Sequence, residues 1–451
     1  MEQKNSRHAL EIFADICVGC SHCIRVCPTE ALRVVRGKAL MFSDWCVDCG
    51  ECYRVCPTRA IKIVDDDIKQ IFKYKYRVLM VPAVFFGQFA NKISREEINA
   101  FLCDMGFTEV CAVEQGADVL QAELKQYVTT HSKPVISSFC PAVVRLIQVR
   151  FPVLVNQVMQ LIPPLEITAQ YYKRSFEAKG VPANELGIFY VTPCAAKIAS
   201  IKAPIGGYTS PINGVINMEH LYSKVYLAYK NKKTRKDFDS EIKIKENSAL
   251  SSTGIYWPMT GGEARHIKGR ALAIDGMANV IEFLEKVENE EIDGVDFLEL
   301  RACDESCAGG ILTYDNRFLA VERLKQMAAV APKEHQLVDE YRKFCSAHIP
   351  MQPVEPRSMV KYDVNMKIAL EKMDKAHRLK ELLPGIDCGA CGAPSCEALA
   401  QDIVCRDVSI NACIFMKTRF EKEGTLSQES GVEIMEKIWG KERFTDKPES
   451  N

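Results

Sequence analysis

Between residues 76 and 345 the apolar positions follow two patterns that alternate along the chain. Short apolar runs that end in loops predict strands, and longer stretches with an apolar residue every three or four positions predict helices. The predicted strands are 77–84, 109–113, 135–137, 187–191, 271–274 and 296–300, and the predicted helices are 117–127, 142–150, 165–176 and 277–287. Because strands alternate with helices, we expect an α/β domain with largely parallel sheets.

The segments on either side have different patterns. Residues 1–65 hold eight cysteines in two matched halves, which predicts a ferredoxin-like α+β module. Residues 345–363 are rich in proline and lack periodicity, as in a linker, and a helical pattern from residue 364 leads into a third cysteine-rich segment. We therefore predict a two-cluster domain at 1–75, an α/β domain at 76–350, and a linker with a small α-helical domain at 351–451, whose last ten residues we expect to fray.

Composition narrows the class of protein. The 58 basic and 59 acidic residues nearly cancel, so no overall field favours nucleic acid or an anionic membrane. The start, MEQKNSRHALEIF, has no apolar core of signal-peptide length, and the most apolar stretch (78–86) is too short to span a bilayer. We expect a soluble, cytoplasmic protein, in which 20 cysteines indicate metal ligation more than disulfides.

The N-terminal cysteines form two runs of the type C-x2-C-x2-C-x3-C-P, the bacterial two-cluster ferredoxin pattern. Three closely spaced thiolates grip one cubane and the fourth reaches the other. The predicted ligands are Cys17, Cys20, Cys23 and Cys56 for one 4Fe–4S cluster and Cys46, Cys49, Cys52 and Cys27 for the second. A pair of zinc sites is the alternative, and two complete copies of the run count against it.

The last cysteine-rich segment, CGACGAPSCEALAQDIVC…NAC, resembles the small 4Fe–4S domain of Rnf-type and corrinoid-protein electron-transfer chains. The resemblance implies Cys388, Cys391 and Cys396 as ligands, with Cys413 as the fourth. Cys405 is the alternative fourth ligand, and a zinc site is the alternative to a cubane.

Four further cysteines follow predicted strands of the central domain. Cys140 precedes Pro141, which suits the first turn of a helix, and a thiolate at a helix N-terminus is stabilised by free N–H groups. Cys194 follows a second strand, and Cys303 and Cys307 follow a third. One such cysteine would be a buried apolar residue by default. Because strand ends meet in one crevice of an α/β sheet, four of them predict another cluster site.

At these positions the chain resembles the iron–iron (FeFe) hydrogenases, whose motifs have the forms TSCCP, MPCxxK and ACxxGCxxGG. The corresponding stretches here are SSFCP (137–141), TPCAAK (192–197) and ACDESCAGG (302–310), with VPAV, GAD, TGGEA and AIDGMANV as supporting likenesses. The order of the modules resembles that of the sensory hydrogenases, without the PAS domain that some of them carry.

The resemblance implies specific roles. Cys140, Cys194, Cys303 and Cys307 would hold a 4Fe–4S cubane, and Cys307 would also bridge to a diiron subcluster with CO, CN⁻ and azadithiolate ligands. Lys197 would hydrogen-bond an iron-bound cyanide; without the motif, it would be read as a solvent-facing helical residue. The implied partners are H2 and protons, a redox partner such as ferredoxin, the hydrogenase maturases that insert the diiron unit, and a signalling partner, with no nucleic acid and no membrane.

The chain also departs from the family pattern. Phe139 stands where fast members have a proton-passing cysteine, and general acid–base steps contribute roughly 10²–10⁴-fold each. Ser200 replaces a relay glutamate, Thr192 and Arg301 replace methionines, and Ser306 replaces a glycine. We therefore expect slow, reversible H2 oxidation and proton reduction, suited to anaerobic hydrogen sensing or redox signalling. The alternative is a non-catalytic electron-transfer or assembly protein without the diiron site, as in the Narf-like proteins, although these lack the complete eight-cysteine ferredoxin pair and the terminal CGACGAPSC module.

Overall fold

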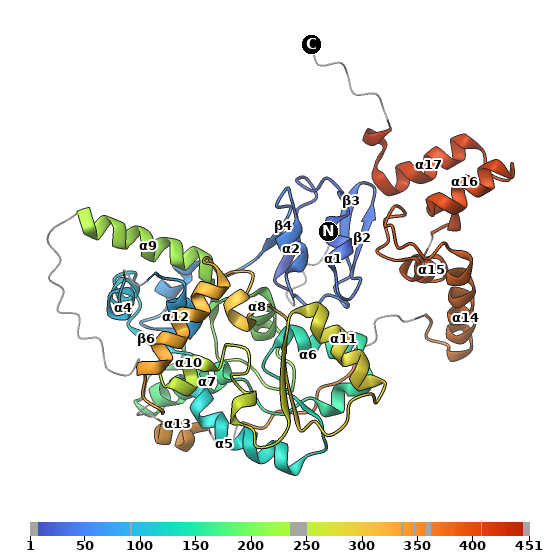
Figure 1. Ribbon diagram of the computed structural model, residues 1–451. Coiled ribbons are helices and arrows are strands. Elements are labelled where there is room, and N and C mark those ends of the chain that lie inside the picture. Colours follow the sequence, from blue (N-terminus) through green and yellow to red (C-terminus); the bar gives the residue numbers. More distant parts are fainter. Residues whose placement is uncertain are drawn as a thin grey trace. The chain divides into compact units, whose positions relative to one another are not determined.

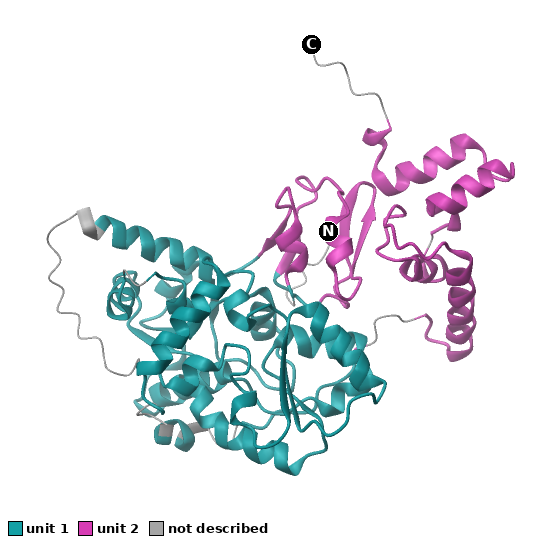
Figure 2. Cartoon of the chain, in the orientation of Figure 1, with its two compact units in different colours: residues 1–9, 47–49, 64–356 teal, residues 10–46, 50–63, 357–451 magenta. Residues whose placement is uncertain are grey.

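The computed structural model describes residues 8–90, 93–234, 250–334, 338–345, 349–357, 362–406 and 408–444. The chain forms two compact units (Figure 2): unit 1 comprises residues 1–9, 47–49 and 64–356, and unit 2 comprises residues 10–46, 50–63 and 357–451. The ferredoxin-like and C-terminal segments thus share one unit, while the three predicted domain boundaries stay a prediction. Parts of the expected linker, and most of the end expected to fray, lie outside the described residues.

Unit 1 contains two parallel sheets. The larger sheet has the strand order β6-β5-β8-β9, and the smaller one has the order β10-β11-β7. The strands are β5 (Tyr76–Val81), β6 (Glu109–Ala112), β7 (Val135–Ile136), β8 (Leu186–Thr192), β9 (Gly214–Asn217), β10 (Ala271–Asp275) and β11 (Phe297–Arg301). The expected α/β fold with parallel sheets is confirmed.

Helices follow the strands of unit 1 (Figure 1). They are α3 (Ala83–Gly87), α4 (Arg95–Asp104), α5 (Gln115–Thr130), α6 (Pro141–Arg150), α7 (Pro164–Ala178), α8 (Ala195–Lys202), α9 (Met218–Thr234), α10 (Ser252–Tyr256), α11 (Met277–Glu288), α12 (Arg317–Val330) and α13 (Val338–Cys345). The strand predicted at 77–84 ends at Val81, because Pro82 caps the short helix α3. Strand β9 was not predicted, since four residues carry little periodicity.

Two apolar cores stabilise unit 1. One packs around the larger sheet and includes Leu79, Phe189 and Ile216. The other packs around the smaller sheet and helix α6 and includes Leu298 and Ile147. Both cores consist of residues that are almost completely buried, so the loops that follow the strands are held on a rigid base.

The ferredoxin-like segment, most of which belongs to unit 2, repeats itself after 29 residues. Strand β1 (Leu10–Ile12) pairs with β4 (Ile61–Ile63), β2 (Leu32–Val35) pairs with β3 (Lys38–Met41), and the short helices are α1 (His22–Val26) and α2 (Glu51–Val55). Left-handed backbone recurs at the same spacing: φ is 60°, 65° and 51° at Gly19, Ser21 and Glu30, and 53°, 84° and 54° at Asp48, Gly50 and Arg59. The two cysteine runs therefore fold alike, as their sequences predict.

The C-terminal part of unit 2 is helical, as expected. Its helices are α14 (Met366–Leu382), α15 (Cys396–Cys405), α16 (Ile414–Lys422) and α17 (Gln428–Trp439), around a small core that includes Leu399, Ala412 and Met416. Among the described residues, no helix combines the length and apolar character needed to cross a membrane.

Candidate metal centre

The four central cysteines lie in loops that follow strands of both sheets of unit 1. Cys140 is the N-cap of α6 and comes after β7, and Cys194 is the N-cap of α8 and comes after β8. Cys303 and Cys307 follow β11, and Cys307 lies in the 3-10 turn η6 (Ser306–Gly309). The thiol of Cys194 interacts electrostatically with those of Cys307 and Cys140. The structure thus brings cysteines from three separate loops together.

Close backbone contacts hold the loop of Cys307 against its neighbours. The N–H of Leu312 donates to the carbonyl of Pro193 at 2.9 Å, and a Cβ at Gly310 would lie 2.4 Å from the same carbonyl. The N–H of Cys307 donates to Pro258 O at 3.1 Å. Ser306, at the position of the family glycine, has φ 52°, a left-handed conformation that is costly for a side chain other than glycine.

Thr192, one of the departures from the family pattern, positions Cys194. Its hydroxyl donates to the carbonyl of Cys194 at 2.8 Å and accepts from the N–H of the same residue at 3.2 Å. Thr192 is fully buried at the end of β8. The replacement therefore fixes the backbone of a predicted ligand.

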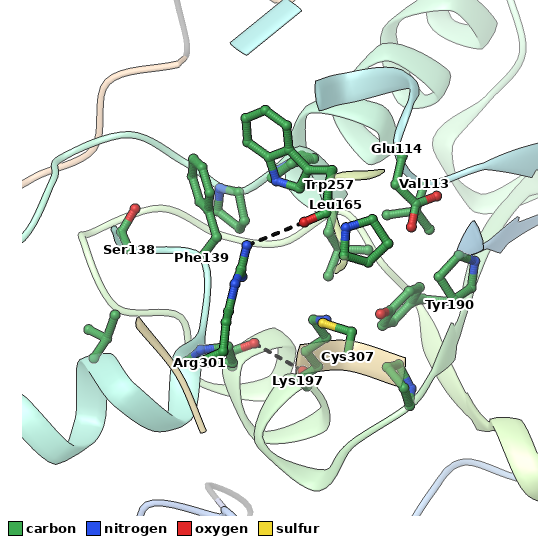
Figure 3. A pocket seen from close by; sticks show the side chains of 18 of the residues that line it. Val113, Glu114, Ser138, Phe139, Leu165, Tyr190, Lys197, Trp257, Arg301 and Cys307 are labelled. Atoms are coloured by element: carbon green, nitrogen blue, oxygen red, sulfur yellow. Dashed lines mark hydrogen bonds between the residues drawn. The ribbon is translucent and has the colours of Figure 1, made fainter. Parts of the chain in front are cut away.

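A cavity adjoins Cys307 and Lys197 (Figure 3). The empty space inside the cavity and its mouth is about 880 Å³. The centres of water-sized molecules can occupy about 80 Å³ of this space. The walls are mostly apolar and include six prolines, namely Pro82, Pro141, Pro163, Pro164, Pro193 and Pro258. One water needs roughly 10–15 Å³ of such space, so the cavity has room for a group of several atoms.

Lys197 supplies a positive charge to this cavity. It lies in the first turn of α8, lines the cavity, and its Nζ donates to Cys307 Sγ at 3.2 Å. Burial lowers the pKa of Lys197. The interactions with Cys307, Tyr190 and Cys194 outweigh this effect, so the pKa lies well above its ordinary value. The ammonium group is therefore available to an anionic group held beside Cys307.

Phe139 closes one wall of the cavity. Its side chain is 4 % exposed and packs against Trp257, with ring centroids 5.7 Å apart and planes tilted by 42°. Figure 3 shows the two rings side by side at the cavity wall. Because neither ring exchanges protons, this wall provides no acid or base.

Arg301 brings a second cation to the cavity and belongs to a buried network. Its guanidinium donates to Glu263 and lies 3.6 Å from Glu299, and Glu263 also accepts from the hydroxyl of Ser137 at 2.6 Å. The Arg301 Nε atom is buried but makes no hydrogen bond within this network. Arg301 also interacts electrostatically with Cys307 and Cys140. The methionine expected from the family is thus replaced by a charge balanced by two carboxylates.

Glu114 is a cavity residue that the sequence reasoning missed. It follows β6, is 4 % exposed, and accepts from the N–H of Ala83 at 2.9 Å. Burial raises the pKa of Glu114 to about 7, although the charges of Lys197 and Arg95 lower it. Its place at a strand end was the signal that could have identified it. Ser200 also lines the cavity, and its hydroxyl donates to the Lys197 carbonyl at 3.0 Å.

The first N-terminal set of cysteines also converges. Cys23 interacts electrostatically with Cys17, Cys20 and Cys56, the four predicted ligands of one cubane. The sulfur atoms accept backbone hydrogen bonds, from Ala39 N to Cys17 at 3.3 Å and from Ala60 N to Cys56 at 3.2 Å. Such N–H···S bonds stabilise thiolates bound to iron, so these residues suit a cubane.

The second set divides between the units. Cys27, Cys46 and Cys52 belong to unit 2, and Cys49 belongs to unit 1, where it packs against the core around the smaller sheet. Cys27 accepts from Ala31 N at 3.2 Å, the same bond that Cys56 makes 29 residues later. Their joint ligation of one cluster stays a prediction.

The C-terminal cysteines line a small cavity of unit 2. Its empty space is about 270 Å³, and its cysteines are Cys388, Cys391, Cys396 and Cys413. Cys405 does not line it and instead interacts with Lys372, Arg406 and Asp402. The structure therefore brings Cys413 to the other three, and leaves Cys405 at the end of α15.

Comparison with known families agrees with this geometry. Residues 75–268 match the family of the iron only hydrogenase large subunit, C-terminal domain; residues 9–57 match the 4Fe-4S dicluster domain; and residues 383–415 match an Fe-S cluster family. The resemblance to the iron–iron hydrogenases with flanking iron–sulfur modules is confirmed. No curated protein matches the chain.

Among solved structures, the chain is similar to an FeFe-hydrogenase studied for oxygen inactivation of the H-cluster 2Fe subcluster, with a TM-score of 0.48, 15% identity, and coverage of 65% of this chain and 96% of that one. For HydA(deltaEFG), studied for stepwise H-cluster assembly, the TM-score is 0.46 at 15% identity, covering 62% and 94%. For a variant of HydA1 from Chlamydomonas reinhardtii it is 0.45 at 16% identity, covering 65% and 96%.

Proposed function

We propose that this protein is an FeFe hydrogenase-type iron–sulfur protein that oxidises H2 and reduces protons slowly and reversibly, and that it serves hydrogen sensing or redox signalling more than bulk turnover. Cys140, Cys194, Cys303 and Cys307 would hold a 4Fe–4S cubane, with a diiron CO/CN⁻/azadithiolate unit attached through Cys307. The observation that carries the proposal is the cavity beside Cys307, which is mostly apolar and contains the ammonium of Lys197.

The donor set and the space fit this cofactor. When bound, the diiron unit supplies an open iron site at which H2 is split, chemistry that no side chain provides. Lys197 would hold the cyanide through an ionic hydrogen bond, since a buried ammonium needs an anionic partner. The mostly apolar walls lower the local dielectric constant, which strengthens this bond.

The expected slow rate follows from how the residues handle protons. Phe139 cannot pass a proton between the cavity and the protein surface. The hydroxyl of Ser200 donates its hydrogen bond to the Lys197 carbonyl. Glu114 is the carboxyl group that lines the cavity, and its raised pKa suits it to hold a proton near neutral pH at its carboxylate oxygens. Among the described residues that line the cavity, no second carboxyl group extends Glu114 into a relay, so proton delivery would limit turnover.

The alternative function is an electron-transfer or assembly protein that keeps the cubanes but not the diiron unit. The observation that favours it is Arg301, whose guanidinium and two partner carboxylates introduce charge where the family has an apolar methionine. Under this alternative, the cavity would stay without metal and the protein would be indifferent to H2.

Infrared spectroscopy of the full chain, loaded with cubanes and treated with a synthetic diiron cofactor, distinguishes the two functions. We expect CO and CN⁻ bands and exchange of H2 with D2O. The matched control is Cys307→Ser, which removes the bridging thiolate and should retain no bands after desalting. Full cubane content without CO and CN⁻ bands in the parent protein would support the alternative.

The partners belong to the same proposal. In the cytoplasm, electrons would pass between the central cubane and a ferredoxin-type donor through the flanking clusters, maturases would insert the diiron unit, and a signalling partner would respond to the redox state. The flanking cluster domains at both ends of the chain support an electron route of this kind.

A further inference from the structure

The C-terminal helical module packs on the first ferredoxin-like half within unit 2. Strand β2 pairs with β3 on one edge, and its other edge bonds to the module: Val34 N donates to Gly392 O at 2.8 Å and Arg36 N donates to Lys437 O at 2.9 Å. Beneath this edge, Arg33 and Asp402 form a buried ion pair at 2.5 Å. Backbone bonds and a buried charge pair together make a defined contact.

This contact joins the two loops that carry cluster ligands. The Arg25 guanidinium, two residues after Cys23, donates to the carbonyl of Cys388 at 3.1 Å. A Cβ at Gly389 would lie 3.6 Å from Ile24 Cδ1, so the backbone of the Cys388 loop packs against the side chain that follows Cys23. Ligand residues of the terminal site and of the first ferredoxin-like site are thus separated by a single layer of side chains.

Trp439 makes a second connection between the same two loops. Its indole Nε1 donates to Ala390 O, between Cys388 and Cys391, at 2.9 Å. Its own carbonyl would lie 2.5 Å from a Cβ at Gly37, and Gly37 in turn touches Gly19 in the loop of Cys17 and Cys20. Both contacts lead to the first ferredoxin-like site.

The internal repeat gives a matched comparison. Arg54 stands 29 residues after Arg25, in α2, and its guanidinium lies 3.8 Å from Glu51 of the same helix. The equivalent position in the second half therefore makes a local ion pair, whereas Arg25 reaches a cluster loop 363 residues away. The module contacts the first half in a way that the repeat alone does not require.

We propose that the terminal cluster site is the outer end of a linear electron-transfer chain, exchanging electrons with the Cys17–Cys20–Cys23–Cys56 site across the Arg25–Cys388 and Trp439–Ala390 contacts. It is thus not a separate branch from the central cubane. In each exchange one cubane loses one electron and is oxidised, the other gains it and is reduced, and no bond or proton moves. The inference rests on the proposed function only in that both sites hold cubanes, and it does not need the diiron unit.

The test uses the full chain loaded with cubanes but without the diiron unit, reduced chemically and measured by pulsed electron paramagnetic resonance. Replacing Cys388 and Cys391 together by Ser removes the terminal cubane. We expect the iron content to fall by one cubane and the spin relaxation of the ferredoxin-like signals to slow several-fold, because a nearby paramagnet is lost. Unchanged relaxation with that loss of iron would overturn the inference. Unchanged iron content would overturn it too, because the terminal site would then hold no cubane.

A second pair of variants keeps all cubanes and changes only the contact. Arg33→Glu places a negative charge against Asp402, and we expect relaxation to slow as in the double-serine variant while iron content stays at the parent value. Arg36→Glu is the control, because Arg36 is exposed and bonds to the module through its backbone. Equal relaxation in both variants and the parent, with Arg33→Glu shown by limited proteolysis to release the module, would contradict the proposal.

Discussion

Two cysteine-lined cavities of this protein differ in charge and size. The terminal cavity, with about 270 Å³ of empty space, is lined by four cysteines, the carboxylate of Asp387, two small residues and the apolar side chains of Pro384, Leu399 and Ile414. The central cavity has about 880 Å³ and contains Lys197, Arg301 and Glu114 beside Cys307. If both cavities hold clusters as proposed, the terminal one offers cysteine thiolates without a cation, whereas the central one adds two fixed cations that would suit a further anionic group.

The largest effect is expected from giving the central cavity a proton carrier. Phe139→Cys should raise the rate of H2/D2O exchange by about 10²–10⁴-fold, because a general acid–base step is restored at the cavity wall. Gas-exchange mass spectrometry on matured protein measures it. Phe139→Ala is the matched control, since it opens the same space without a thiol. An equal rise in both variants would mean that space, and not proton transfer, limits the rate.

The next effect concerns the cation that distinguishes the central cavity. Lys197→Met should weaken retention of the diiron unit by about 3–5 kcal/mol, the cost of removing one partner of a buried charge pair. Retained infrared intensity after dilution measures it, with the cubane signal unchanged. Lys202→Met is the control on the same helix, where the lysine is partly exposed and lies 3.7 Å from Asp66. Equal losses in the two variants would contradict the assigned role of Lys197.

A third prediction concerns the carboxyl group of the central cavity. Burial raises the pKa of Glu114 to about 7, so the folded protein binds this proton more tightly than the unfolded chain. Its contribution to stability is fully present below the unfolded pKa of about 4.5 and is lost as pH rises through about 7. Between pH 4.5 and 7 this group should lower the unfolding free energy of the parent protein by about 3 kcal/mol, and Glu114→Gln should abolish that decrease. Denaturant titration at several pH values measures it.

The control for Glu114→Gln is Glu166→Gln. Glu166 is also buried, its pKa is also raised to about 7 by burial, and it does not line the central cavity. Both variants should flatten the stability curve, but only Glu114→Gln should change the pH profile of H2/D2O exchange. A change of that profile in neither variant would exclude Glu114 as the proton-holding group.

The smallest effect belongs to the terminal cavity and concerns a neutral hydroxyl group. Ser395 lines it and caps α15 by accepting from Ala398 N at 3.0 Å. Ser395→Ala should cost about 1 kcal/mol and speed loss of terminal iron to a chelator. Ser427→Ala removes the equivalent cap of α17 outside the cavity, and should lower stability similarly without faster iron loss. Equal iron loss would mean that this cap does not protect the site.

Local patterns made much of the fold predictable. The two cysteine runs specify matched loops because their ligands lie within a few residues of one another, and the apolar runs located six strands of unit 1. The four-residue strand β9 and the short helix α3 were missed because such lengths carry little periodicity. The place of Cys405 was left open, since spacing alone does not tell which side of α15 faces the ligands.

The charges of the central site were less predictable. Glu114 and Glu263 come close to Lys197 and Arg301 only after the chain folds, whereas Glu299 lies two residues before Arg301 in the same strand, β11. Arg301 was noticed as a departure from a family motif, but the two acids that balance it were not. Non-local charge pairs leave no periodic trace in a sequence, so their partners emerge only from the folded chain.

The bonds from the C-terminal segment to β2 have a consequence for shortened forms of the protein. A two-stranded sheet is marginal alone, and an open edge is a template for pairing with other chains. Cutting the chain after residue 357 would uncover the N–H groups of Val34, Arg36 and Gly37 that now donate to Gly392, Lys437 and Ile438. Such a truncated form would tend to self-associate. By covering the strand edge, the terminal module therefore also protects the protein from aggregation.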